Sequence, residues 1–399
     1  MSRAPNPEIL QLISDPIRLG VAGLGRGFML TLPSLIADPH TKLVACAAPR
    51  EDSRQAFRNR FGGNAYDSIE ALAGDPDVEA VYIATPHQMH REHAEILAAG
   101  GKHLLIDKPL AIKMDDATAI VEAVEHAGVT LITGPSHSFD QPIIEARRLI
   151  NEGRFGTVRM LHTFNYTDFL YRPRRPEELS TELGGGVVFS QAVHQVDVVR
   201  LLMGGEAVAV TAATGAWDPN RPTEGAYAAL IQFDGGRFAN LVYSGYAHYD
   251  SDALQDGIGE LGNPKDMSAY GAARRALAKV SSPEEEAALK STRTFTGTDP
   301  PAVAPYSEHF GPMIVSCDGA DLRISPTKIE VWGDSKRETL EVSAEPAPRT
   351  EVLKGLYNAI RHNAPPPQDG RWGRASLEIC HAILESAKTN ERVRLRHQK

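Results

Sequence analysis

The sequence predicts two domains: a doubly wound α/β domain, followed by an α+β domain whose open, mainly antiparallel sheet is flanked by helices. The chain has 399 residues, which is more than one hydrophobic core usually supports. In its first third, short apolar runs alternate with helical segments, and this alternation indicates βαβ units in a parallel sheet. Beyond residue 200, strand-like runs are separated mostly by short turns, which is typical of an antiparallel sheet.

Composition is that of an ordinary soluble protein and excludes several function classes. Hydrophobic residues make up 42% of the chain and charged residues 23%. The net charge of −9 argues against a general nucleic-acid binder, which needs a basic surface. Three cysteines are too few for a disulfide framework or a zinc cluster. The N-terminal segment has acidic residues and no long apolar core, so we expect neither a signal peptide nor a membrane span, and a cytoplasmic protein.

A glycine-rich turn follows the first predicted strand, and a helical pattern follows the turn. Strand, glycine turn and helix in this order are typical of a dinucleotide site, where backbone N–H groups approach a pyrophosphate at the helix N-terminus. The third glycine of the usual motif would fall at Phe28, so the motif is incomplete, and Gly27 stands one place early. The expected cofactor-binding residues of this turn are Gly23, Gly25, Arg26, Gly27 and Phe28.

The end of the second strand is where a dinucleotide site usually places an acid that binds the ribose. Ala48 stands there, followed closely by Arg50. A missing acid and a nearby arginine favour tolerance of a 2′-phosphate, so Arg50 would permit NADP as well as NAD. Alternatively, Arg50 is a solvated residue at a helix start, and Glu51 or Asp52 reaches the ribose. The choice between NAD and NADP stays open.

Further strands and helices complete the first domain. In order, they are strand Val78–Ala84, helix Met89–Ala99, strand His103–Ile106, helix Asp115–His126 and strand Val129–Thr133. Gly134-Pro135 then interrupts the pattern. We therefore assign residues 1–134 to a nucleotide-binding domain and residues 135–399 to a second domain.

Lys108 stands where a predicted strand ends, in Asp107-Lys108-Pro109. A residue before proline is pushed toward extended geometry, so Lys108 is presented at the carboxyl end of the strand. In open α/β sheets this edge binds ligands. Thr85 and Pro86 end the preceding strand in the same way. The alternative is a surface lysine in a strand-to-helix turn.

Three polar residues are placed on one face of an otherwise apolar helix in the second domain, predicted from about residue 188 to 203. Gln191, His194 and Asp197 are spaced by three, so Asp197 can hold the ring of His194. The alternative is a histidine and a carboxylate that satisfy each other at a helix surface. The glycine run 184–186 before the helix and the apolar surroundings favour substrate binding.

Strand-like runs build the expected open sheet, which is interrupted by a segment too long for a hairpin loop. The predicted strands are Ala207–Ala216, Ala226–Phe233, Arg237–His248, Met313–Ser316, Asp321–Ile324, Lys328–Trp332 and Glu338–Val342. The interrupting segment, at about residues 250–305, contains a basic and an acidic helical piece, and we interpret it as a lid or an oligomer arm. Two helices, Glu351–His362 and Gly373–Lys388, end the chain.

An arginine run precedes the triple glycine. Arg172, Arg174 and Arg175 fall within four residues, bounded by prolines that stiffen the loop. Arginine binds carboxylates through a planar fork, so this loop predicts an anionic substrate. The alternative is a solvated basic loop that pairs with Glu177 and Glu178.

The ordered segments GLGRG, ATPHQMH, AGGKHLLIDKP and GGGVVFSQAVHQVD resemble the glucose–fructose oxidoreductase and inositol dehydrogenase family, Gfo/Idh/MocA. The resemblance spans most of the chain and implies a Rossmann domain, an NAD or NADP cofactor and a dehydrogenase whose catalytic lysine is Lys108. It implies His194 as a second catalytic residue, but Ser190 stands where the family has an aspartate. The further cofactor contacts it implies are Thr85, Pro86, His90 and Asp107. The second sheet of the family often mediates oligomers, so we expect a homodimer or homotetramer.

Within that family, YRPRRPEEL, the GGGVVFSQAVHQVD helix and KDMSAYGAARR look like the phthalate cis-dihydrodiol dehydrogenases. This resemblance implies oxidation of the 4,5-cis-dihydrodiol of phthalate to 4,5-dihydroxyphthalate. Lys108 would be the first choice for the base that takes the hydroxyl proton, and His194 the second. His137, in the segment that begins the second domain, is a further candidate for substrate binding.

Two other functions compete with this hypothesis. A sugar, inositol or sugar-acid dehydrogenase of the same family would need no arginine run. A cofactor-sensing regulator without catalysis fits the serine at position 190, although Lys108 and His194 are both retained. We expect no metal, because His87 and His90 have no evident third ligand nearby.

Overall fold

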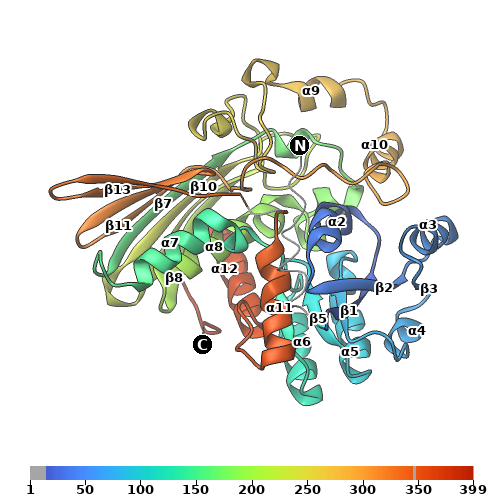
Figure 1. Cartoon of the computed structure of the whole chain (residues 1–399). Coiled ribbons are helices and arrows are strands. Elements are labelled where there is room, and N and C mark those ends of the chain that lie inside the picture. The colour runs from blue at the N-terminus through green and yellow to red at the C-terminus, as the bar shows by residue number, and fades with distance from the viewer. Residues whose placement is uncertain (1–14, 345–346, 399) are drawn as a thin grey trace. The chain divides into compact units, whose positions relative to one another are not determined.

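The computed structural model describes residues 15–344 and 347–398, and the chain forms two compact units (Figure 1). Unit 1 comprises Met1–Pro135, Ser291–Val303 and Glu345–Gly373, and unit 2 comprises Ser136–Lys290, Ala304–Ala344 and Arg374–Lys399. The first unit thus ends one residue after the boundary placed at 134. Two later segments also belong to unit 1, because they pack against the first sheet and its helices. A single boundary in the sequence cannot predict that later parts of the chain return to the first unit.

Unit 1 contains a six-stranded parallel sheet in the order β3-β2-β1-β4-β5-β6, the strand order of a Rossmann fold. Its strands are β1 (Ile17–Ala22), β2 (Thr41–Ala47), β3 (Asn64–Tyr66), β4 (Ala80–Ile83), β5 (His103–Ile106) and β6 (Leu131–Thr133). Its helices are α2 (Arg26–Ala37), α3 (Glu51–Phe61), α4 (Ile69–Ala73), α5 (His90–Ala99), α6 (Met114–Ala127) and α11 (Thr350–His362). The predicted α/β domain is confirmed.

The central strands of this sheet are apolar on both faces because helices cover both. In β4 and in Leu104–Ile106 of β5, every residue is fully buried. The returning segments complete the core: Phe295 packs edge-on against Phe28, and Gln368 accepts a backbone hydrogen bond from Thr133. Sequence periodicity gave no sign of these contacts, since each joins residues more than 200 positions apart.

Unit 2 is built on a nine-stranded sheet in the order β14-β13-β12-β11-β7-β10-β9-β8-β15. Its strands are β7 (Val158–Tyr166), β8 (Ala207–Gly215), β9 (Ala226–Phe233), β10 (Phe238–Ser244), β11 (Met313–Cys317), β12 (Ala320–Ile324), β13 (Lys328–Gly333), β14 (Arg337–Glu341) and β15 (Val393–Arg394). Only β7 and β10 pair in parallel, so the expectation of a mainly antiparallel sheet is confirmed. Strand β7 was not predicted, although it lies in the middle of the sheet. Its polar and aromatic residues give only a weak alternation of apolar positions.

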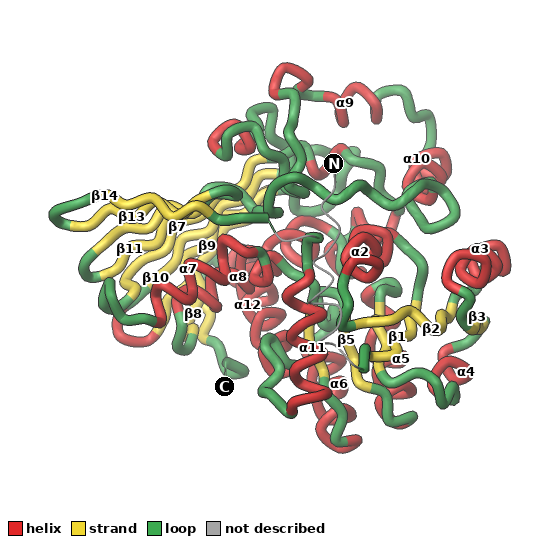
Figure 2. Tube along the Cα trace, in the orientation of Figure 1, coloured by secondary structure: helices red, strands yellow, loops and turns green. Residues whose placement is uncertain are grey.

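Helices cover one face of this sheet and leave the other open (Figure 2). The helices of unit 2 are α7 (Gln141–Asn151), α8 (Val193–Met203), α9 (Ala272–Leu277), α10 (Pro283–Ser291) and α12 (Gly370–Thr389), the last from Arg374 on. On the covered face, Leu161 and Ile231 are fully buried. On the open face, Met160, Phe238 and Ile314 are each more than one-third exposed. An open apolar face suits the expected homodimer or homotetramer, which stays a prediction.

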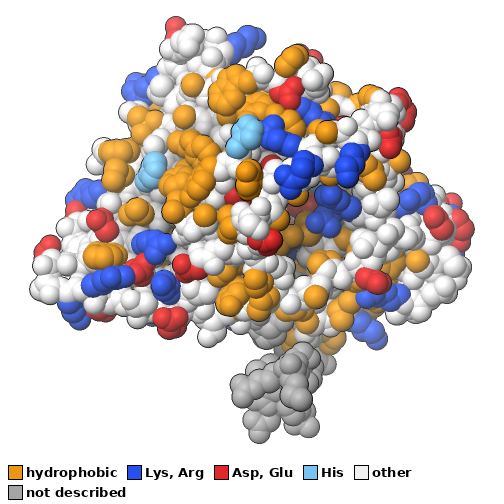
Figure 3. Space-filling view, turned by 90° about the horizontal axis from the view of Figure 1, so that it is seen from above, with side chains coloured by type: hydrophobic (Ala, Val, Ile, Leu, Met, Phe, Trp, Pro, Cys, Tyr) orange, Lys and Arg blue, Asp and Glu red, His pale blue; other side chains and the backbone are white. Residues whose placement is uncertain are grey.

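The interrupting segment carries α9 and α10 and keeps large hydrophobic side chains at the surface. Tyr249 and Tyr270 are both more than half exposed, and the view from above shows hydrophobic and basic side chains gathered on that face (Figure 3). The cysteines Cys46, Cys317 and Cys380 form no disulfide. Within the described parts of the chain, no helix combines the length and apolarity that crossing a membrane requires.

A glycine with left-handed backbone geometry begins the segment that carries the predicted substrate-binding helix. Gly186 has a φ of 77°, and a Cβ there would overlap the carboxylate of Glu224. That carboxylate is buried and cannot yield easily, because it accepts hydrogen bonds from Val188 N at 3.0 Å, Thr223 Oγ1 at 3.1 Å and Thr181 Oγ1.

We therefore expect Gly186→Ala to lower the free energy of unfolding by about 2–4 kcal/mol, since it combines backbone strain with broken hydrogen bonds. Gly235→Ala is the matched control: Gly235 also has a positive φ, 66°, but no atom lies within 4 Å of its Cβ position. The control should lose only the strain, about 1–2 kcal/mol. Urea unfolding measures both, and equal losses would contradict the role of Glu224.

Candidate active site

The glycine turn of unit 1 has the shape that a dinucleotide site requires. Gly23 has a φ of 91°, and a Cβ there would lie 3.0 Å from Ala84 O. Gly25 caps α2, and its carbonyl accepts the hydrogen bond of Met29 N at 3.1 Å. The N-terminus of a twelve-residue helix therefore begins at the carboxyl end of β1, where its N–H groups can bind phosphate.

Gly27, which the sequence motif places one position early, has a structural reason of its own. A Cβ at Gly27 would overlap Oδ2 of Asp107, the residue that follows β5. Asp107 in turn accepts a hydrogen bond from Lys108 N at 2.9 Å. Glycine at position 27 thus lets the first turn of α2 pack directly on the segment that holds Lys108.

At the end of β2, the acids that could bind a ribose already have partners within their own helix. Glu51 binds Arg54 at 2.5 Å and also Arg58, and Asp52 accepts a hydrogen bond from Ser53 N at 3.0 Å. Arg50 donates to Thr294 Oγ1 at 3.2 Å, a contact with the returning segment. The two acids are thus engaged by neighbours in their own helix, and the choice between NAD and NADP stays a prediction.

His90 fastens the ends of two neighbouring strands. It is fully buried, with Nε2 3.1 Å from Thr85 O and Nδ1 3.2 Å from both Pro109 O and Leu110 O. Burial lowers the pKa of His90, against the charge of Asp107, so the ring is neutral at pH 7. His90 therefore holds the backbone at the strand ends beside half-buried Lys108.

In unit 2, the predicted helix 188–203 consists of a π-helical turn, Val188–Ala192, followed by α8. Ser190, at the family's aspartate position, donates a hydrogen bond to Gly186 O of its own turn. Ser136 Oγ lies 3.2 Å from His194 Nδ1, and Ser138 Oγ donates to Asp197 Oδ2 at 2.5 Å. His194 and Asp197, on the predicted polar face of the helix, thus each contact a serine. Neither Ser136 nor Ser138 was predicted from the sequence.

Aromatic rings connect His194 to the arginine loop within unit 2. The His194 ring packs on Phe310 at 5.2 Å between centroids, and Phe310 stacks on Tyr243 at 6.0 Å. Tyr243 donates a hydrogen bond to Gln191 Oε1 at 3.3 Å, and its ring lies edge-on to Phe169 at 6.4 Å. Gln191 and His194 are therefore linked to the loop by a chain of buried contacts.

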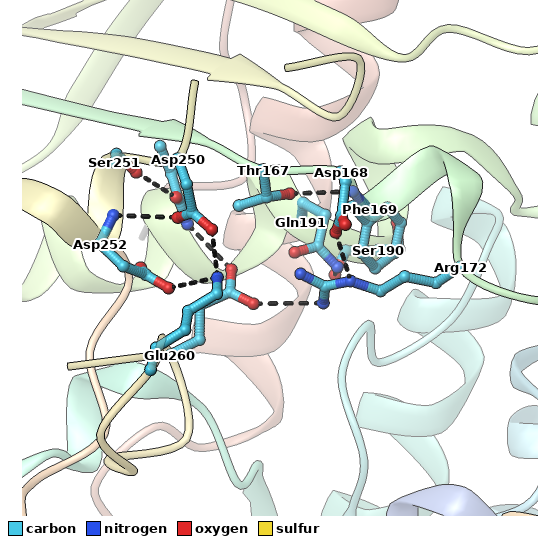
Figure 4. A network of polar contacts seen from close by, with 12 residues as sticks. Thr167, Asp168, Phe169, Arg172, Ser190, Gln191, Asp250, Ser251, Asp252 and Glu260 are labelled. Atoms are coloured by element: carbon cyan, nitrogen blue, oxygen red, sulfur yellow. Dashed lines mark hydrogen bonds and ion pairs between the residues drawn. The ribbon is translucent and has the colours of Figure 1, made fainter. Parts of the chain in front are cut away.

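Arg172 is already matched by two acids (Figure 4). It lies 3.2 Å from Asp168 Oδ1 and 3.3 Å from Glu260 Oε2. Burial works to lower the pKa of Arg172, but Glu260, Asp168 and other neighbours together outweigh it and raise that pKa. Reciprocally, burial works to raise the pKa of Glu260, and Arg172 with His137 holds it below the usual range. Arg172 is therefore a charged residue with a balanced environment.

Arg174 has a different environment. Its guanidinium lies 3.6 Å over the ring of Phe169 and donates to Phe169 O at 2.7 Å. Among the described residues, its Nε has no hydrogen-bond partner. Its nearest carboxylate, Glu178, is 3.8 Å away and is shared with Lys290. Burial, together with Arg172 and other neighbouring cations, lowers the pKa of Arg174 to about 10, so positive charge is in excess here.

The insertion packs on this loop. Glu286 of α10 accepts from Arg174 N at 2.7 Å and binds Arg221 at 2.8 Å, and Lys290 binds Glu178. Burial, with Arg174 and Arg175 nearby, lowers the pKa of Lys290 to about 8. The side chain of Arg175 is 44% exposed and pairs with Glu177 at 3.1 Å. Arg175 thus matches the alternative of a solvated basic loop, which was considered for all three arginines.

A chain of buried acids continues from Arg172 (Figure 4). Asp252 binds Lys265 at 2.8 Å and lies 3.6 Å from His309. Burial raises the pKa of Asp252 to about 7, and the charge of Glu260 adds to this effect. Glu260 and Asp252 were not predicted as site residues, because they lie in the insertion and no motif surrounds them.

The sequence-predicted residues thus form one group in each unit. Unit 1 holds the glycine turn, Arg26, Phe28, Thr85, Pro86, His90, Asp107 and Lys108, and unit 2 holds His137, Arg172, Arg174, Arg175, Gln191, His194 and Asp197. The roles assigned to these residues stay predictions. Glu260, Tyr243 and Phe310 join the second group only through contacts between distant parts of the chain.

Comparison with known proteins agrees with this architecture. Residues 17–134 match the profile of the oxidoreductase family with an NAD-binding Rossmann fold, and residues 143–263 match the GFO/IDH/MocA C-terminal domain. The chain is 45% identical over 377 residues to 1-carboxy-3-chloro-3,4-dihydroxycyclohexa-1,5-diene dehydrogenase of Comamonas testosteroni, covering 93% of this chain and 95% of that protein.

Solved structures show the same fold. A crystal structure described as that of a dehydrogenase from Bordetella bronchiseptica RB50 has a TM-score of 0.91 and 39% identity, covering 96% of this chain and all of the other. A levoglucosan dehydrogenase in complex with NADH and levoglucosan has a TM-score of 0.71 over 95% of this chain and 99% of its own. At 17% identity, the latter indicates the fold alone.

The raised pKa of Asp252 predicts a pH-dependent stability. Between the ordinary value of 3.8 and about 7, the folded state holds a proton that the unfolded state releases. The free energy of unfolding should therefore fall as pH rises through this window, by up to about 4 kcal/mol from this group. Asp252→Asn should flatten that fall.

Urea unfolding at several pH values between 5 and 7.5 measures the slope. Asp256→Asn is the matched control, because Asp256 is a neighbouring exposed acid with a positive φ that asparagine tolerates. If wild type and Asp252→Asn show the same slope, the carboxyl is ionised throughout the window and the assignment is wrong.

Proposed function

The chain belongs to the Gfo/Idh/MocA oxidoreductase family, and from that premise we propose that it oxidises a ring-carboxylated cis-dihydrodiol, with phthalate 4,5-cis-dihydrodiol as the first candidate. It is an NAD(P)-dependent oxidoreductase, so the alternative of a non-catalytic regulator is not supported. The finer assignment concerns the substrate and the residues that act on it.

The observation that carries the proposal is the excess positive charge at Arg174. A guanidinium that is stacked on Phe169, with an orphaned Nε and a shared carboxylate, lacks a full counter-ion. A substrate carboxylate supplies one and can form charge-assisted hydrogen bonds with it. A sugar or inositol has no group of this kind.

The glycine turn fits a dinucleotide for two reasons. The surroundings of positions 23 and 27 exclude any side chain, and the first N–H groups of α2 are available at the turn to bind phosphate. The residues that would hold the cofactor are Gly23, Gly25, Arg26, Gly27 and Phe28, with Thr85, Pro86 and Asp107 at the neighbouring strand ends. Buried His90 would act indirectly, by positioning the backbone of those strand ends. When bound, a nicotinamide cofactor supplies the acceptor for the hydride that leaves the carbinol carbon.

In this proposal, Lys108 Nζ takes the proton of the substrate hydroxyl as the C–H bond breaks, and the oxidised ring rearranges to a catechol. His194, whose Nδ1 lies 3.2 Å from Ser136 Oγ, is the second candidate for the base. Ser190 is turned to Gly186 O, so we assign no proton to the position where the family has an aspartate.

A second candidate substrate is a diol with a single carboxyl group. The Comamonas relative is named for such a compound, which also carries chlorine. The ion pairs favour this candidate in one respect: Arg172 is balanced by Asp168 and Glu260. Arg175 pairs with Glu177, whereas Arg174 has only a carboxylate that it shares with Lys290. The two candidates differ by one carboxylate, and substrate comparison separates them.

Lys108→Ala should lose turnover while keeping its cofactor, because the base is removed and the glycine turn is untouched. We expect kcat to fall by about 10²–10⁴-fold, the usual contribution of a general base. Cofactor affinity, measured by fluorescence titration with NADH and NADPH, should stay near that of wild type. The control Lys113→Ala removes an exposed lysine beside α6 and should be fully active. A Lys108→Ala enzyme within about tenfold of wild-type kcat would exclude Lys108 as the base.

Arg174→Met keeps apolar contact with Phe169 and removes the charge. We expect kcat/KM to fall about 10–100-fold for carboxylated cis-diols, the effect of losing a charged hydrogen bond, mainly through KM. The activity with an uncarboxylated cis-diol should change little. Arg175→Met is the control, since Arg175 is exposed and paired with Glu177.

The substrate panel comprises the cis-dihydrodiols of phthalate, benzoate, 3-chlorobenzoate and benzene, with inositol and sugars. Wild type should prefer carboxylated diols, and the ratio of phthalate to benzoate diols decides between the two candidates. Equal activity with the benzene diol, or equal losses in Arg174→Met for all diols, would refute carboxylate recognition by Arg174.

A further inference from the structure

His137 belongs to a second polar cluster of unit 2, formed with Asp140 and Glu308. The three residues are buried, with exposures of 8%, 7% and 6% respectively. One ring nitrogen of His137 and one carboxylate oxygen of each acid all lie within 4.8 Å of one another. His137 Nδ1 is 2.7 Å from Asp140 Oδ2. His137 and Asp140 come from the start of unit 2, and Glu308 from a loop about 170 positions later. No sequence motif therefore links the three residues.

The cluster combines two buried carboxylates with one imidazole. A cation bound by these groups would offset the cost of burying their charge.

A cavity with an unmatched oxygen adjoins the cluster. This cavity is lined by His137, Glu308 and Gln255, among others. Gln255 is 1% exposed, and its Nε2 donates to Gly311 O at 3.0 Å. Within the described residues, its Oε1 has no hydrogen-bond partner. This buried acceptor is independent of the three clustered residues and calls for a cation or a donor.

We propose that His137, Asp140 and Glu308 bind a divalent transition-metal cation of the Zn²⁺ or Mn²⁺ class. One imidazole with two carboxylates suits these ions, whereas Ca²⁺ and Mg²⁺ prefer oxygen ligands alone. Bonds of about 2.1 Å place opposite ligands about 4.2 Å apart, so the three ligand atoms need little rearrangement. Gln255 supplies a neutral oxygen in the adjoining cavity, directly or through a water.

The cation has a positioning role in this proposal. The His137 ring packs edge-on against His194, with 4.7 Å between centroids. A metal-bound His137 cannot rotate, so it holds the ring against which His194 packs. The site differs from the HQMH pair considered from the sequence, and the proposal departs from the expectation that the protein binds no metal.

The test uses full-length protein without a histidine tag. Elemental analysis of protein purified without chelator measures resident metal, and calorimetry follows Zn²⁺ and Mn²⁺ added to chelator-stripped protein. We expect about one equivalent of one of these ions per chain and a raised melting temperature. Asp140→Asn and Glu308→Gln should each weaken binding by about tenfold or more. Glu145→Gln, an acid on α7 that binds Arg148 at the surface, is the matched control and should bind as wild type does.

Two outcomes overturn the proposal: no saturable binding of either ion, or unchanged binding in both ligand variants. Circular dichroism checks that the variants fold. A wild-type crystal soaked in Zn²⁺ gives an answer that needs no variant. An anomalous peak bonded to Asp140 and Glu308 supports the site, and a peak only elsewhere, such as at a cysteine, refutes it.

Discussion

The arrangement of unit 2 depends on the need to match buried charge. Arg172 lies between Asp168 and Glu260, and this ion pair joins the loop before the triple glycine to the insertion. The pair draws Asn165, Asp252 and Lys265 into one network, because each acid taken from water requires its own donor. Removing either partner would leave a charge that the interior cannot solvate.

The same constraint separates three arginines that look equivalent in the sequence. Arg172 is balanced, Arg175 is solvated beside Glu177, and Arg174 is stacked on Phe169 with less than one full counter-ion. The charge available to a ligand therefore depends on the partners of each arginine, and three of these contacts, from Glu260, Glu286 and Lys290, come from the insertion. Helix α10, with Glu286 and Lys290, is in this sense part of the specificity loop.

Local patterns predicted the fold class, the glycine turn, the placement of Lys108 and the helix with Gln191, His194 and Asp197. These features depend on spacing within one element or on the residues that follow a strand, and such information is present in a single stretch of sequence. The patterns did not predict Glu260, Tyr243, Phe310, the two serines that contact α8 or the acid cluster at His137. Each of these depends on a pairing between segments that are distant in the chain, and no periodicity encodes such a pairing. Strand β7 was missed for a related reason: its burial comes from its neighbours in the sheet rather than from its own alternation.

The close packing of Gly27 on Asp107 has a consequence for how the family can diverge. A glycine one place early looks like a damaged phosphate motif, yet the space it leaves is occupied by the carboxylate beside Lys108. A side chain at position 27 is compatible with the fold only if residue 107 becomes smaller or turns away. Positions 27 and 107 are therefore expected to change together: a larger residue at position 27 requires a smaller or differently oriented residue at position 107.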